Sequence, residues 1–75
     1  MNAEQRVRAC YQHCVLCYVG NELMTNTTLR KRLAISDENY AMASRVIKST
    51  IDDGLIKILD PGAGYRLRQY VPFWA

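Results

Sequence analysis

The sequence predicts a mostly helical α+β fold, in which three helices are followed by a C-terminal β-hairpin. Apolar residues recur at helical spacing over residues 3–19 and again over residues 37–53. Two later apolar runs, residues 55–59 and 65–70, are separated by the turn-forming segment Asp-Pro-Gly-Ala-Gly. The chain has 75 residues, which is the length of one domain, and we interpret residues 1–75 as that single unit.

The first predicted helix, residues 3–19, carries cysteines on one apolar face. That face consists of Val7, Cys10, Tyr11, Cys14, Cys17 and Tyr18, with His13 at its flank. Thiolates and imidazoles bind zinc, but ligands on one helix cannot all converge on a tetrahedral ion. We therefore interpret the cysteines as core residues and predict no bound metal. Redox chemistry and a metal shared with a partner chain are the alternatives.

The opposite side of this helix is also apolar, because Ala9, Leu16 and Val19 lie there. We expect Phe73 and Trp74, from the terminal Val-Pro-Phe-Trp-Ala segment, to pack on this second face. A patch exposed to a partner, including a second copy of the chain, is the alternative.

A second, shorter helix is predicted over residues 26–33. Gly20 ends the first helix, and residues 22–24 form a connector that could be one edge strand. Thr25 is placed to cap the second helix, and Met24 and Leu29 have the spacing of a hydrophobic staple. Its outer side carries the basic run Arg30-Lys31-Arg32, which serves either phosphate binding or solubility.

The third helix, residues 37–53, follows a tight turn at residues 34–35. Ser36 is the expected cap, and Gly54, which tolerates positive φ, is the expected stop. The core stripe is Ala43, Val46, Ile47, Thr50, Ile51 and Leu55. The outer face is Ala41, Ser44, Arg45, Lys48 and Asp52. Two helices joined by a short turn, the second with a polar outer face, are typical of a helix-turn-helix, and the hairpin behind them is a predicted wing.

The net charge and the sequence motifs limit the classes of function that the chain can have. The net charge is +3, and all of the excess lies after Thr25, which permits nucleic-acid binding. The sequence has no phosphate-binding glycine loop, and His13 has no evident nucleophile and carboxylate, so we expect neither an enzyme nor a cofactor. It has no secretory signal and no apolar run near the roughly 20 residues of a membrane span. These features favour a soluble cytoplasmic domain.

Four segments, ACYQH, MTN, NYAMASRVIK and YVPFWA, resemble the winged helix-turn-helix domain of RecG-related bacterial proteins. Those proteins are labelled ATP-dependent DNA helicases or transcriptional regulators, and they carry a separate ATP-binding or Schlafen-type AlbA domain. The resemblance covers nearly the whole chain and implies a DNA-binding accessory module, not a helicase motor. The chain departs from the pattern at Cys14 and Cys17 and in its short, weakly charged hairpin turn.

The principal hypothesis is therefore double-stranded DNA binding, with the third helix in the major groove. The predicted contacts are Ser44, Arg45, Lys48 and Ala41 at bases, Asn39 and Tyr40 at a phosphate, Thr27, Arg30 and Lys31 at the backbone, and Arg66 and Arg68 from the wing. Glu38 and Asp52 would repel phosphates, so a dimer on two half-sites is a natural arrangement. The alternative is a protein-interaction or dimerisation winged helix that acts through the first helix and the tail without binding DNA.

Overall fold

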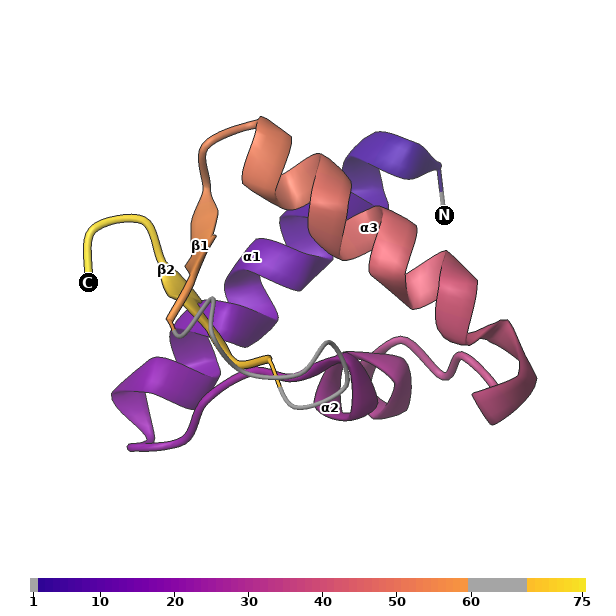
Figure 1. Cartoon of the computed structure of the whole chain (residues 1–75), viewed down its shortest axis with the longest axis horizontal. Helices are drawn as coiled ribbons and strands as arrows, with labels where there is room; N and C mark the ends of the chain where they lie inside the picture. Colours follow the sequence, from indigo (N-terminus) through magenta and orange to yellow (C-terminus); the bar gives the residue numbers. More distant parts are fainter. Residues whose placement is uncertain (1, 60–67) are drawn as a thin grey trace.

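The computed structural model describes residues 2–59 and 68–75 (Figure 1). In this part of the chain three α-helices accompany a two-stranded antiparallel sheet, which confirms the mostly helical α+β class. The elements are α1 (Ala3–Val19), α2 (Asn26–Arg32), the 3₁₀ turn η1 (Asp37–Asn39), α3 (Tyr40–Asp52), β1 (Ile56–Ile58) and β2 (Tyr70–Pro72). None of the described helices is long and apolar enough to cross a membrane.

Helix α1 is the centre of the fold, since α3 and β2 both pack on it. It starts with a capping box in which Asn2 accepts the Gln5 N–H at 2.8 Å and the Gln5 side chain accepts the Asn2 N–H at 3.0 Å. Its buried residues are Val7, Cys10, Cys14 and Cys17. The cysteines are free thiols in the core, as the helical spacing predicted.

Helix α2 begins at the predicted cap. The Thr25 hydroxyl accepts the Thr28 N–H at 3.2 Å, and the Thr28 hydroxyl accepts the Thr25 N–H at 2.9 Å. Met24 and Leu29 are completely buried in the core cluster, as the predicted staple requires. Met24 also forms an isolated antiparallel bridge with Tyr70, so the possible edge strand over residues 22–24 is reduced to one bridged residue.

The connection from α2 to α3 differs from the prediction. Residues 37–53 are not one continuous helix, because a 3₁₀ turn at Asp37–Asn39 precedes α3. Ser36 makes no side-chain cap bond. Its hydroxyl instead accepts the Asn39 side-chain amide at 3.3 Å, and Asn39 has a non-helical backbone. Ala34 takes φ = +55°, the left-handed conformation that a glycine often supplies in such turns.

Helix α3 buries the predicted stripe against α1. Ala43, Val46, Ile47 and Thr50 are buried, and the Thr50 hydroxyl donates to the Val46 carbonyl at 2.7 Å. Gly54, at φ = +75°, follows the helix end as predicted.

The second strand is displaced from its predicted position. β1 lies within the predicted residues 55–59, but β2 is Tyr70–Pro72, so it shares only Tyr70 with the predicted residues 65–70, of which residues 68–69 are not in a strand. The register pairs Ile56 with Pro72 and Ile58 with Tyr70, so Pro72 is itself the last residue of β2. Burial explains the shift, because all three β2 residues are buried and Tyr70 also pairs with Met24. Residues 65–67 lie outside the described part.

The C-terminal tail packs on α1, but not on the predicted face. Trp74 meets Tyr18 edge to face at 5.5 Å between ring centroids, and its indole N–H donates to the Tyr11 hydroxyl at 3.0 Å. Phe73 stacks near Tyr11 at 6.4 Å. Leu16, on the expected face, remains 64% exposed, because the aromatic rings find tyrosine partners at the flank of the buried face.

Candidate nucleic-acid interface

Helix α3 crosses over α1 and presents one long face to solvent (Figure 1). The exposed residues along it are Ala41, Arg45, Lys48, Ser49 and Asp52. We call this set the outer strip of α3. It holds Ala41, Arg45 and Lys48 of the predicted reading residues on one face. Ser44 stands at its edge and is only half-exposed.

Ser44 is occupied by a contact between helices. Asn26, only 5% exposed at the start of α2, donates from its side-chain amide to the Ser44 hydroxyl at 3.1 Å and to the Tyr40 carbonyl at 3.4 Å. The side-chain oxygen of Asn26 accepts from Arg30 Nε at 2.7 Å. One buried amide thus ties α2 to the first turn of α3. Sequence reasoning missed Asn26, since a polar residue in the first turn of a helix gives no signal of burial.

Arg30 is held in place by the same junction. One of its terminal nitrogens donates to the Thr27 hydroxyl at 3.2 Å, and its guanidinium lies 5.4 Å from the centroid of the half-buried Tyr40 ring. The structure therefore brings the predicted backbone-contact residues Thr27 and Arg30 next to Tyr40. Lys31 and Asn39 are both exposed, beside this group in the chain.

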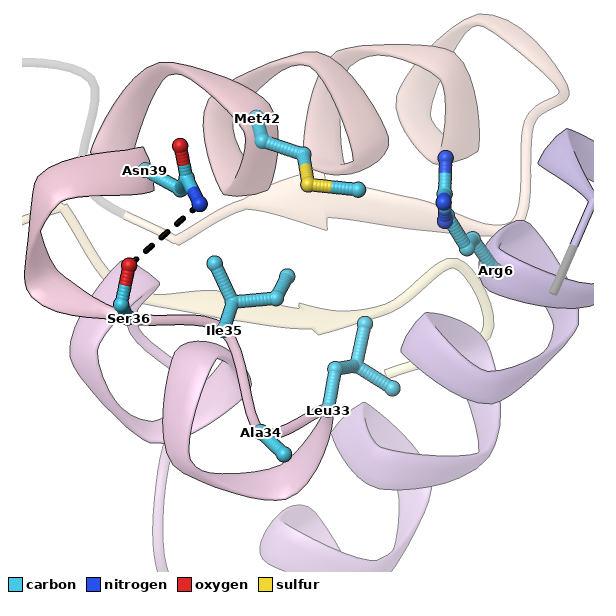
Figure 2. A pocket seen from close by; sticks show the side chains of 7 residues that line it. All are labelled: Arg6, Leu33, Ala34, Ile35, Ser36, Asn39 and Met42. Carbon is cyan, nitrogen blue, oxygen red and sulfur yellow. Dashed lines mark hydrogen bonds between the residues drawn. The ribbon is translucent and has the colours of Figure 1, made fainter.

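Two hollows border α3 on the side of α1. The first, of about 140 Å³, lies between the helices and is lined in part by Arg6, Arg45 and Ser49. The second, of about 380 Å³, lies at the turn before α3 (Figure 2). There Arg6 stands across from the Ser36 and Asn39 pair, with Met42, Ile35 and Leu33 between them. Arg6 is the one charged residue lining this second hollow among the described residues.

Arg6 was not among the sequence-predicted contacts, because its charge is balanced by Glu4 in a simple count. The position of Arg6 in the sequence nonetheless indicated that it lies at the edge of the core. Arg6 stands one helical turn before Cys10, at the edge of the buried face of α1, so its side chain reaches the groove toward α3. Arg8, in contrast, is exposed and pairs with Glu4 at 3.2 Å.

A third hollow, of about 310 Å³, borders α3 on the side of the sheet. Lys48 and Arg68 line it together with Ser44, Asp52 and Tyr70. Arg68 is half-buried, and it is the one of the two predicted wing arginines that lies in the described part of the chain, beside α3. Its predicted companion Arg66 lies outside the described residues. The outer strip of α3 thus carries Arg45 and Lys48, with Arg6 beside it in the hollow toward α1 and Arg68 beside it in the hollow toward the sheet.

Acidic side chains also lie near this face. Asp52 shares the hollow of Lys48 and Arg68 at the end of α3, and Glu38 is exposed in the 3₁₀ turn before it. The cations therefore border the middle of α3, and the carboxylates stand near its two ends.

The cysteines of α1 and His13 are dominated by burial, which keeps the Cys10 and Cys14 thiols protonated. Burial raises the pKa of Cys10 to about 11 and that of Cys14 to about 12, so both are neutral thiols near neutral pH. His13 lies 3.6 Å from Cys17 Sγ and 3.1 Å from the Thr28 hydroxyl, and burial lowers its pKa, helped by the charge of Arg32. In the described ranges no group of three or more His, Cys, Asp or Glu residues is arranged to hold a metal ion.

Comparisons of this chain with protein-family models, with curated proteins and with solved structures gave no match.

Proposed function

We propose that this chain is a winged-helix DNA-binding module that inserts α3 into the major groove of double-stranded DNA. The arrangement of the elements supports this proposal. A short capped helix and a tight turn lead into α3, and antiparallel strands follow α3 directly. The segment between these strands, of which residues 60–67 lie outside the described part, would be the wing. The resemblance to the DNA-binding domain of RecG-related proteins points the same way.

The observation that carries the proposal is the placement of cations on both sides of α3. A helix in the major groove has a phosphate backbone along each flank, and the groove is about 12 Å wide. Arg45 of α3 and Arg6 of α1 line the hollow on one flank of α3, and Lys48 of α3 and Arg68 line the hollow on the other, which also holds Asp52. This is the charge distribution that two phosphate backbones require. A basic surface that served only solubility would not need to lie along both sides of one helix.

The residues then divide by role. Arg45 and Lys48 project from the outer strip and are proposed to reach base edges or the nearest phosphates. Arg6 and Arg68 are proposed to contact the backbone. Ser44, tied to Asn26, is assigned a positioning role that fixes α3 relative to α2.

Fluorescence anisotropy of a labelled duplex of mixed sequence tests this proposal. Arg45→Gln and Lys48→Gln should each weaken binding, by about 1–3 kcal/mol for a residue that reads a base. Lys57→Gln is the matched control, because it removes the same charge from an exposed position on β1. Equal losses in all three variants would mean that binding follows net charge alone, and the assignment to α3 would be wrong.

A further inference from the structure

Two segments of the chain carry no charged side chain. All 17 Asp, Glu, Lys and Arg residues lie outside residues 9–21 and 69–75. These two segments are far apart in sequence but meet in the fold, because Trp74 contacts Tyr11 and Tyr18, and Phe73 stacks near Tyr11. Tyr11 also lines a hollow together with Leu16, so the exposed side chains of both segments are taken together and called the uncharged surface. It consists of Tyr11, Leu16, Tyr18, Val19, Phe73 and Trp74.

This surface contains five of the six large apolar side chains that are exposed in the described part of the chain. Val19 is 70% exposed, Leu16 64%, Phe73 53%, Trp74 50% and Tyr18 40%. Side chains of this size, half-exposed, present on the order of 100 Å² each, or about 500 Å² together. That area is in the range of the largest apolar patch on a typical monomer, a patch that is often functional.

We propose that the uncharged surface is the interface of a two-fold homodimer of this chain. The charge of the molecule supports a second copy as the occupant. Each copy carries a net charge of +3, so two copies repel each other wherever their charged faces approach. On the uncharged surface no like charges meet.

The shape and area of the surface also fit a second copy. A two-fold interface uses the same patch on both partners, so the patch must hold both projections and recesses. The half-exposed rings of Phe73 and Trp74 project beside a shallow hollow of about 330 Å³, lined by Tyr11, Gln12, Val15 and Leu16. Two such patches would bury about 1,000 Å² in total, which reaches the lower limit for a specific interface.

This interface would leave α3 accessible. The C-terminal tail lies at the opposite end of the molecule from the start of α3, and the end of α1 lies near the sheet (Figure 1). The dimer does not depend on DNA binding, so the two proposals can fail separately.

The test is sedimentation equilibrium over a concentration series without DNA, with the emission of Trp74 recorded on the same samples. Trp74 is the one tryptophan of the chain, so its spectrum reports directly on this surface. We expect the mass to rise toward twice the 8.6 kDa of one chain and the Trp74 emission to shift to the blue in parallel. Leu16→Glu should raise the dissociation constant roughly tenfold or more, because each copy would then bury an unpaired carboxylate.

Ser49→Glu is the matched control, since it adds the same charge at an exposed helical position away from the surface. It should leave the dissociation constant unchanged, and circular dichroism should show that both variants are folded. A wild-type chain that stays monomeric throughout would overturn the proposal. So would dimerisation without a change in Trp74 emission, equal weakening by both variants, or a monomeric chain whose surface binds a different protein.

Discussion

The buried side chain of Asn26 should be one of the largest polar contributions to the stability of this fold. Asn26→Ala removes three hydrogen bonds, to the Ser44 hydroxyl at 3.1 Å, from Arg30 Nε at 2.7 Å and to the Tyr40 carbonyl at 3.4 Å. The first two are well formed, and the third is at the limit of a useful distance. At about 1 kcal/mol for each good bond, the loss is about 2 kcal/mol.

The higher helix propensity of alanine offsets about 0.5 kcal/mol of this loss. The expected decrease in the free energy of unfolding is therefore about 1.5 kcal/mol, or about 6–12 °C in melting temperature for a domain of this size. Urea denaturation followed by circular dichroism measures it. Asn39→Ala is the control, because Asn39 is exposed and its side chain makes one contact, to Ser36, so that variant should lose less than about 0.5 kcal/mol.

A double variant with Ser44→Ala sharpens the test. If Asn26 and Ser44 act together, the two losses should not add, and the coupling should be at least about 0.5 kcal/mol. A loss below about 0.5 kcal/mol for Asn26→Ala, or an equal loss for Asn39→Ala, would refute the reasoning that this amide ties α2 to α3.

Three further predictions concern the turn and the core. Ala34→Gly should stabilise the fold by about 0.5 kcal/mol in urea denaturation, because relief of the left-handed strain exceeds the added entropy of the unfolded chain. Ala41→Gly, in helical backbone, should instead destabilise it by about 1 kcal/mol, and two changes of the same sign would contradict this account. Cys10 and Cys14 should resist a thiol reagent at pH 8 in the native state and react at once in denaturant, because both are fully buried and their pKa values are raised. Since the pKa of His13 is lowered below 6.5 in the folded state, the unfolded state takes up the proton first, and stability should fall as the pH decreases from 6.5 toward the folded-state pKa. His13→Gln should remove that part of the pH dependence, and an unchanged pH profile of the variant would contradict it.

The structure could be predicted correctly from the sequence wherever a local pattern determines it. The spacing of Val7, Cys10, Cys14 and Cys17 predicted the buried face of α1, and Thr25 predicted the start of α2. These features depend on helical periodicity and on a cap bond within four residues. They can therefore be predicted from residues that are close together in the sequence.

Long-range pairing decided the position of the second strand, which the sequence did not predict correctly. Tyr70–Pro72 became the second strand because Tyr70 pairs with Met24, a residue 46 positions earlier, and because this segment is buried. The start of α3 at Tyr40 is a local difference: the Asn39 side-chain amide donates to the Ser36 hydroxyl three residues before it, and Ser36 makes no cap bond.

In the candidate interface, too, a local pattern predicted some of the residues, and packing between helices determined the others. Arg45 and Lys48 could be predicted, because helical spacing placed them on the polar face of α3. Arg6 was missed: helical spacing shows only that it lies at the edge of the buried face of α1, and its place beside α3 depends on how the two helices cross in the packed core.

A salt titration of DNA binding by the unmodified chain tests the central claim most directly. Four cations border α3, and each phosphate contact adds about 0.9 to the slope of the logarithm of affinity against the logarithm of salt concentration. We expect binding to a duplex of mixed sequence at low salt, with a slope of about −3 to −4. Absence of binding at low salt, or an affinity that does not change with salt, would contradict the proposal that α3 and its flanking cations bind DNA.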